Sequence, residues 1–325
     1  MPACPDLETF INHLESDDIY ELYGKIRGNN FYLGAVQNDM MVFGNIRMVS
    51  ELDSSFHMYI DATFGVTPFH AEQLLVVMAE IHQKPRPIGY VLMTSRTEKD
   101  YVAVLEHMRD SLISFDGNIR VPSSAMCDYE KGLRNALVKV WPEIAVKGCL
   151  FHMTKALRQK ARNMKELSTK IKRGTMHHKT LLMFSRLALL PLNRIDAGLA
   201  ALKNFISSNY ALKKDFGRFI EYFDRNWMGR YNKKDWCVVD CPRRTNNHCE
   251  GHNSFIKMTI KRNPSPWTFI DGLIDLIFEA LSSMAAEKEN FTRIDRSQIT
   301  NSLTRNLIKL NENCINELEF LKLMI

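Results

Sequence analysis

The sequence predicts an α/β fold built on a mixed β-sheet, and two observations support this prediction. Between residues 56 and 151, strand patterns and helix patterns follow one another in the order βββαβαβ. Residues 56–66 alternate in the manner of a strand, with one face more apolar than the other. Strands that alternate with helices need crossover connections, so part of the sheet is expected to be parallel.

The spacing of apolar residues predicts the individual elements in chain order. The lead-in predicts a helix at 7–14 and a weak hairpin from 31–36 and 40–43. The expected strands of the core are 56–66, 73–81, 88–94, 124–128 and 145–151, and its helices are 99–114 and a segment that carries Leu133 and stops at Pro142. Further helices are expected at 155–172, 178–190, 196–208, 211–224, 250–260, 268–288 and 302–323.

These elements divide the chain into four regions. Residues 1–55 form a mixed lead-in, and residues 56–152 form the first part of the α/β core. An all-helical insertion is expected at 153–236, and residues 237–325 complete the core with the helix of Glu250 and C-terminal helices. Ligand sites in such sheets lie at the carboxyl ends of the strands, where Asp128 is expected.

The composition is that of a soluble globular protein, with 325 residues, 45% hydrophobic and 25% charged. The longest apolar run, 74–79, is too short to span a bilayer, and no secretory signal is visible. A nuclear or cytoplasmic protein is expected, neither secreted nor membrane-bound. The seven cysteines are irregularly spaced, which favours reduced thiols over a disulfide framework.

Basic residues gather in one segment. Residues 155–173 hold eight basic residues and one acidic residue, a net charge of 8 − 1 = +7, against +6 for the whole chain. Such a run suits a surface that binds a polyanion such as DNA, although a solvated helix face has the same pattern. The expected DNA contacts in this segment are Lys155, Arg158, Arg162 and Lys165.

Three acidic residues stand in contexts that suggest a shared site: Asp61 in a strand, Asp128 at a strand end, and Glu250 at a helix start. Carboxylates gathered together repel one another unless a cation compensates them, so the three suggest two Mg²⁺ or Mn²⁺ ions and phosphoryl chemistry. Each also has a structural reading. Asp61 suits an edge strand, Asp128 suits a helix cap, and Glu250 suits a capping box with Asn247 as N-cap.

Several motifs, taken in order, resemble the Mutator-like element transposases. They are Asp-Ala-Thr-Phe at 61–64, Ile-Gly-Tyr-Val-Leu-Met at 88–93, Cys-Asp-Tyr-Glu-Lys-Gly-Leu-Arg-Asn-Ala at 127–136, Trp-Pro at 141–142, Gly-Cys-Leu-Phe-His at 148–152 and Thr-Asn-Asn-His-Cys-Glu-Gly-His at 245–252. The resemblance implies a ribonuclease-H-like core with a helical insertion before the third acid. It also implies a DDE triad of Asp61, Asp128 and Glu250, with His152 beside the acids.

The remaining candidate residues have weaker contexts. Cys149 and His152 match the family's Cys-x-x-His element, but a tetrahedral zinc site needs two more ligands, so zinc is not expected. Lys257 and Lys261 are expected on the helical stripe of Glu250, where they could hold a DNA phosphate or lie in solvent. Trp227 and Trp236 suit core packing better than base stacking.

The sequence therefore favours a DDE-type transposase that cuts DNA and transfers strands during transposition, acting as a homo-oligomer on DNA with two divalent ions. The family's zinc-binding recognition module has no counterpart in the sequence, so a separate DNA-recognition protein or module is a further expected partner. A domesticated, non-catalytic DNA-binding or chromatin protein is the alternative. A structure-specific nuclease is a third reading.

Overall fold

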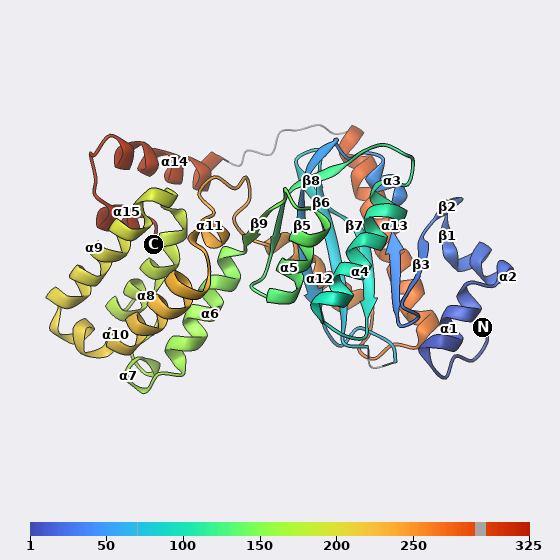
Figure 1. Cartoon of the computed structure of the whole chain (residues 1–325), viewed down its shortest axis with the longest axis horizontal. Coiled ribbons are helices and arrows are strands. Elements are labelled where there is room, and N and C mark those ends of the chain that lie inside the picture. Colours follow the sequence, from blue (N-terminus) through green and yellow to red (C-terminus); the bar gives the residue numbers. More distant parts are fainter. Residues whose placement is uncertain (70, 290–296) are drawn as a thin grey trace. The chain divides into compact units, whose positions relative to one another are not determined.

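The computed structural model describes residues 1–69, 71–289 and 297–325, and it describes side chains except those of 287–301. The chain divides into two compact units (Figure 1). Unit 1 comprises Met1–Val146 and Asn246–Phe291 and contains the β-sheet. Unit 2 comprises Lys147–Thr245 and Thr292–Ile325 and consists mainly of helices. Each unit has its own buried core.

A seven-stranded mixed sheet has the order β3-β4-β7-β6-β5-β8-β9. β5 pairs antiparallel with β6 and parallel with β8, so it lies where the sheet changes direction. β1 and β2 form a separate two-stranded ribbon. The strand bounds are β1 Lys25–Ile26, β2 Asn29–Asn30, β3 Tyr32–Val36, β4 Met40–Gly44, β5 Ser55–Thr63, β6 Gln73–Ile81, β7 Lys84–Met93, β8 Val121–Cys127 and β9 Ala145–Gly148.

The predicted order βββαβαβ is confirmed by β5, β6, β7, α4, β8, α5 and β9. The hairpin predicted in the lead-in is confirmed as β3 and β4, which extend the same sheet. The first core strand is shorter than predicted, because Gly65 has φ +77, a left-handed conformation that does not continue a strand. The fifth strand is also shorter and ends at Gly148.

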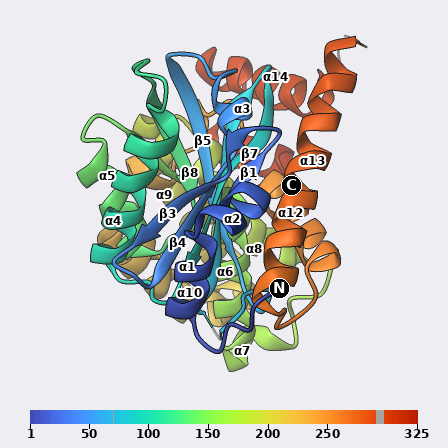
Figure 2. The ribbon, with the colours of Figure 1, turned by 90° about the vertical axis from the view of Figure 1, so that its right-hand side faces the viewer.

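Helices cover both faces of the sheet in unit 1 (Figure 2). α4 and α5 pack together on one face, and α12 and α13 lie on the other. The central strands are therefore buried on both sides, as the long apolar runs of β6 and β7 require. The helix bounds are α1 Leu7–Leu14, α2 Asp17–Ile19, α3 Ile46–Val49, α4 Glu98–Met108, α5 Lys131–Val140, α12 Asn247–Thr259 and α13 Pro266–Glu289, with π-helical turns at Tyr20–Gly24 and Arg109–Ile113.

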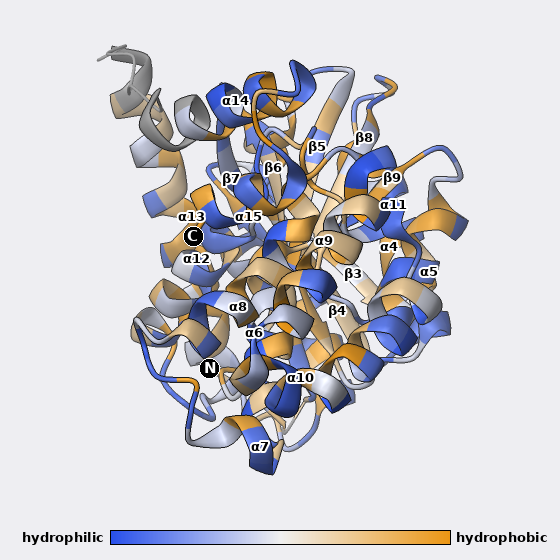
Figure 3. Cartoon of the chain, turned by 90° about the vertical axis from the view of Figure 1, so that its left-hand side faces the viewer, coloured by the Kyte–Doolittle hydropathy of each residue, from blue (hydrophilic) through white to orange (hydrophobic). Residues whose placement is uncertain are grey.

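Unit 2 packs its helices around an aromatic core that includes Phe184, Phe216, Phe219 and Phe223. Its helices alternate hydrophilic and hydrophobic stretches, as expected when one face packs inward (Figure 3). The bounds are α6 Leu150–Arg162, α7 Lys165–Ser168, α8 Met176–Arg186, α9 Ile195–Ser208, α10 Tyr210–Phe223, α11 Lys233–Trp236, α14 Ser297–Asn311 and α15 Glu317–Leu323. Short 3₁₀ turns lie at Leu187–Leu189 and Leu192–Arg194, and a π-helical turn lies at Asp224–Arg230.

Two predicted helices are each divided in the structure. The segment predicted as 155–172 is α6 followed by α7, because the backbone becomes extended at Met164. The segment predicted as 302–323 is α14 followed by α15. Asn313 has φ 56, which ends the first helix, and Asn316 and Glu319 form a capping box that starts the second.

Candidate active site

Asp61 and Asp128 lie on neighbouring parallel strands near the carboxyl ends of both. β5 and β8 pair in parallel, and the last paired residues are Tyr59 and Met126. Counting two residues further along each strand gives Asp61 on β5 and Asp128, which directly follows β8. In parallel strands, residues in register point to the same face. The register therefore places both carboxylates at one end of the sheet.

Asn246 connects these two strands to the helix of Glu250. Its side-chain amide donates to the carbonyl oxygen of Ile60 at 2.9 Å and to that of Met126 at 3.2 Å. Asn246 is fully buried and is the N-cap residue of α12. The amide thus binds two strand carbonyls where the ladder between β5 and β8 ends. Ile60 directly precedes Asp61, so the contact fixes the start of α12 beside the acid-bearing strand ends.

Glu250 lies one turn into α12, where its backbone N–H donates to the carbonyl of Asn246 at 3.0 Å. The helix packs against β5, on the face that carries Asp61. The predicted capping box with Asn247 is wrong. Asn247 is the first helical residue, the N-cap is Asn246, and the Asn246 amide binds the strands and makes no side-chain cap. The tertiary contacts outweigh the local capping pattern.

Hydrogen bonds orient one oxygen of each aspartate. Asn253, on α12, donates from its side-chain amide to Asp61 Oδ2 at 2.9 Å. The backbone N–H of Glu130 donates to Asp128 Oδ1 at 2.9 Å, a turn that precedes α5. Asp128 does not cap α5, because the N-cap of that helix is Glu130 and it has no side-chain cap; the Asp128 carboxylate closes a turn just before the helix.

Glu130 is a further acidic residue at this end of the sheet, and sequence reasoning did not single it out. The Tyr101 hydroxyl donates to Glu130 Oε1 at 3.1 Å. Burial of Glu130, with the nearby charge of Asp128, raises the pKa of its carboxyl group. The sequence feature that could have indicated Glu130 is its place as the second acid of Asp-Tyr-Glu, two residues after Asp128. Asn253 carried no such signal, because its partner lies 192 residues away.

The chemistry of this donor set fits Mg²⁺ or Mn²⁺, since carboxylate oxygens are the ligands these ions prefer. Within residues 1–69, 71–289 and 297–325, no three His, Cys, Asp or Glu side chains lie close enough together to hold an ion. All seven cysteines are free thiols.

Cys149 and His152 belong to unit 2 and stand at the start of α6, not at the end of a strand as predicted. Cys149 is the buried N-cap residue of α6, and His152 lies in its first turn. The α-helix begins five residues before the predicted start at residue 155 because Leu150, Met153 and Leu157 form a buried helical stripe.

The basic residues singled out in unit 2 are exposed, with three on α6 and Lys165 on α7. Lys155, Arg158 and Arg162 recur at helical spacing on the solvent side of α6. In unit 1, Lys257 is exposed on α12, but Lys261 lies beyond the end of that helix at Thr259. The predicted helical stripe from Glu250 therefore stops before Lys261.

Core packing is confirmed for Trp227 and Trp236, which are 2% and 0% exposed. The indole N–H of Trp236 donates to the carbonyl of Trp227 at 2.8 Å. Both rings are therefore part of unit 2's interior. In the described part of the chain, no helix is both long enough and apolar enough to cross a membrane.

Residues 57–156 match the model of the MULE transposase domain. The matched segment runs from β5 into α6 and includes Asp61, Asp128 and His152, while Glu250 lies outside it. No curated protein matches the chain. Residues 57–156 are therefore similar to the MULE transposase domain, and this segment carries the two aspartates at the strand ends.

Proposed function

We propose that this chain is a DDE-type DNA transposase with a ribonuclease-H-like core, in which Asp61, Asp128 and Glu250 act together on a phosphodiester. The contact of Asn246 with the strands of both aspartates carries the proposal. One buried amide ties together the three segments on which the acids stand. The order βββαβαβ supports the ribonuclease-H-like assignment, and the family match supports DNA as substrate.

The proposed reaction has two in-line displacements at phosphorus. A water oxygen first bonds to phosphorus while the bond to the 3′ oxygen breaks, and that oxygen leaves as a 3′-hydroxyl. The freed 3′-hydroxyl then attacks a second phosphodiester, forming a new bond and releasing another 3′-hydroxyl. Two bound Mg²⁺ or Mn²⁺ ions would supply activation of the attacking oxygen and stabilisation of the leaving one.

The residues of the chain have distinct parts in this proposal. The carboxylates of Asp61, Asp128 and Glu250 would hold the ions. Asn253 donates to one oxygen of Asp61, and the backbone N–H of Glu130 donates to one oxygen of Asp128. His152 is proposed to contact the scissile phosphate, and exposed basic residues such as Lys155 and Lys257 would bind the DNA backbone.

A non-catalytic, domesticated DNA-binding protein is the alternative function. One observation favours it: among the side chains that the structure describes, no three metal-ligating groups are close enough to share an ion. In a catalytic protein, the carboxylates would close around the ions when these bind. The two functions differ in whether the acids are needed for anything beyond folding.

Asp128→Asn tests the proposal, because it removes a metal-binding charge and nearly preserves the shape. Metal-dependent nicking of supercoiled DNA should fall by several orders of magnitude, since metal-assisted stabilisation is worth several kcal/mol and about 1.4 kcal/mol is tenfold in rate. DNA binding without metal should persist. Asp53→Asn, at an exposed position in the same unit, is the matched control and should nick like the wild type.

Two results would contradict the catalytic proposal. Clear nicking by the wild type that Asp128→Asn leaves unchanged would show that the acids are misassigned. DNA binding without cutting by the wild type, on DNA that carries the element's own ends, would favour the domesticated alternative.

A further inference from the structure

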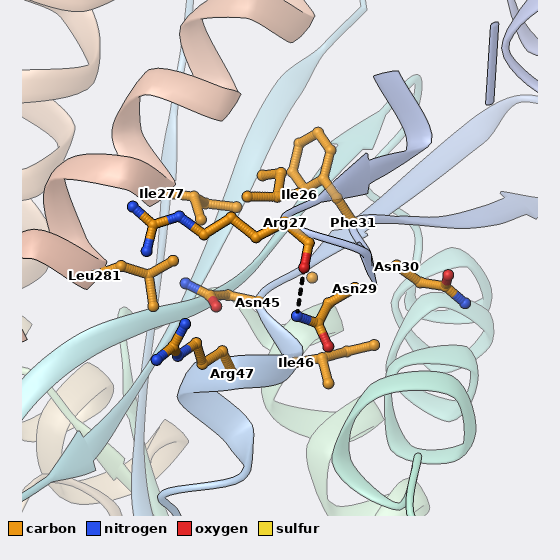
Figure 4. Close-up of a pocket in the computed structure, with 11 residues that line it drawn as sticks. Ile26, Arg27, Asn29, Asn30, Phe31, Asn45, Ile46, Arg47, Ile277 and Leu281 are labelled. Atoms are coloured by element: carbon orange, nitrogen blue, oxygen red, sulfur yellow. Dashed lines mark hydrogen bonds between the residues drawn. The ribbon is translucent and has the colours of Figure 1, made fainter. Parts of the chain in front are cut away.

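A shallow hollow in unit 1 gathers basic and amide groups away from the three acids (Figure 4). Its walls come from the β1–β2 ribbon, the end of β4, the start of α3 and the middle of α13. Among the described residues that line it, two are arginines, three are asparagines and none is acidic.

Asn45 supplies a buried donor to this hollow. Its side chain is 4% exposed, and its Oδ1 accepts a hydrogen bond from the Met48 backbone N–H at 3.2 Å. This bond fixes which side of the amide is Nδ2, and Nδ2 has no hydrogen-bond partner among the described residues. In Figure 4 the amide nitrogen lies between the guanidinium groups of Arg27 and Arg47. A buried donor without a partner is costly, so it indicates a missing acceptor.

Arg27 is held in position by an unusual backbone turn and by an aromatic ring. It occupies the two-residue loop between β1 and β2 with φ 50, followed by Gly28 with φ 78. Such a turn favours asparagine or glycine at the first position, and a strained residue of another type points to function. The Arg27 guanidinium stacks over the Phe278 ring with its carbon 5.3 Å from the ring centre. Stacking uses the faces of the group and leaves its N–H edges for a ligand.

Arg47 completes the donor set from the first turn of α3. Its side chain is exposed, and within the described part of the chain no acidic group forms an ion pair with it or with Arg27. Two guanidinium groups and one amide therefore face a hollow that lacks negative charge. Arginine forks and amide N–H groups match the oxygens of a phosphate group in geometry and charge.

We propose that Arg27, Asn45 and Arg47 form a phosphate-binding site, separate from the three acids. The phosphate would belong either to a nucleic-acid backbone or to a free phosphate ion. As a site for the nucleic-acid backbone, it would hold DNA beside β4, and β7 and β6 lie between β4 and the acid-bearing β5. In that case the inference rests on the proposed function. As a free-phosphate site, it would be independent of that function.

Two measurements on the whole chain distinguish these sources. The first follows line broadening of the ³¹P signal of inorganic phosphate at constant ionic strength. The second follows the salt dependence of binding to a short DNA duplex without metal. The test variant is Arg27→Gln with Arg47→Gln, and the charge-matched control is Arg305→Gln with Lys309→Gln, at exposed positions on α14. Asn45→Asp keeps the acceptor for Met48 and replaces the amide donor with a charge that repels phosphate.

A free-phosphate site predicts broadening in the wild type and the control, and at least about tenfold weaker binding in the test variant, because two charge-assisted hydrogen bonds are removed. A backbone site predicts that the log–log salt slope falls in the test variant only, by about 0.9 for each phosphate that the protein no longer neutralises. Asn45→Asp should change the same measurement as the test variant and in the same direction: weaker phosphate binding for a free-phosphate site, or a lower salt slope for a backbone site.

The proposal is overturned if neither measurement separates the test variant from the control. Equal weakening in both variants would show a response to net charge without a site. Neither measurement requires metal or DNA cutting, so a failure of the proposed transposase reaction would leave this result interpretable.

Discussion

At the scale of single residues, asparagine side chains organise the candidate site more than the acids do. Asn246 joins two strands to α12, and Asn253 binds Asp61. The places of Asp61 and Asp128 near strand ends and of Glu250 at a helix start could be predicted from local sequence, because the first two end or interrupt apolar strand patterns and the third opens a helical pattern. The asparagines could not, because their partners lie 120 to 192 residues away along the chain. Local patterns favoured Asn247 as a cap, and tertiary hydrogen bonds made Asn246 the important residue.

Replacing Asn246 with alanine should destabilise unit 1 by roughly 2–4 kcal/mol, since two buried carbonyl groups lose their donor. Asn247→Ala, at the exposed neighbouring position, should change stability by less than about 0.5 kcal/mol. Urea unfolding of both variants measures the difference. A larger loss of stability in Asn247→Ala than in Asn246→Ala would support a capping box at Asn247. It would also contradict the role of Asn246 in linking the segments that carry the acids.

Asp215, in unit 2, should make stability depend on pH. Burial alone would raise the pKa of its carboxyl group, but hydrogen bonds from Lys170 at 2.6 Å and His177 at 2.9 Å outweigh burial and lower it. Because the folded-state pKa lies below the unfolded value of 3.8, this contribution is complete above that value. It is lost as the pH falls through the folded-state pKa.

Asp215→Asn should therefore reduce stability near neutral pH by roughly 1.5–3 kcal/mol, the range for hydrogen bonds to charged groups. It should also flatten the stability curve below about pH 4. Chemical unfolding between about pH 2 and pH 7 measures both effects. A variant that loses stability at neutral pH and keeps the wild-type acid slope would show that other carboxylates carry the acid dependence.

At the scale of elements, strands and long helices were predicted well, whereas their ends were predicted poorly. Alternation of apolar residues places β5 within a few residues, and a continuous apolar run does the same for β6, because burial of the strand faces dominates their composition. The ends depend on single backbone conformations, such as the positive φ of Gly65 and Asn313. Apolar periodicity does not record these conformations, so 155–172 and 302–323 were predicted as single helices.

The break between α6 and α7 sharpens the prediction for the basic segment. Lys155, Arg158 and Arg162 share the exposed side of α6, while Lys165 begins α7. Replacing all four with glutamine should lower the log–log salt slope of DNA binding by about 0.9 for each phosphate that these side chains neutralise. Sequence preference should hardly change.

A control for the basic segment is Lys213→Gln with Lys214→Gln, which removes two charges at exposed positions on α10 of the same unit. A salt titration should leave its slope at the wild-type value. If the fourfold variant also keeps the wild-type slope, the segment is a solvated helix face and does not bind DNA.

At the scale of the whole molecule, the chain leaves unit 1 after Val146 and returns at Asn246. Near this crossing, the backbone N–H of Leu150 donates to the carbonyl of Arg244 at 3.0 Å, which holds the two connecting segments together. The three acids belong to unit 1, and the main basic segment belongs to unit 2. The sequence predicted an interruption of the core by helices. Which helices form one unit depends on contacts between segments distant in sequence.

This division predicts that metal binding by the acids of unit 1 can be separated from DNA binding by the basic segment of unit 2. A chain in which a short glycine and serine linker replaces residues 149–245, and which ends after residue 291, keeps all of β9 and also Asp61, Asp128, Glu250 and their asparagine partners. It should unfold cooperatively in urea, because the sheet and its covering helices stay together. It should bind Mn²⁺ as the full chain does, with a shallower salt slope for DNA. Loss of Mn²⁺ binding from a cooperatively folded short chain would mean that unit 2 contributes a ligand, and His152 would then be the first residue to replace.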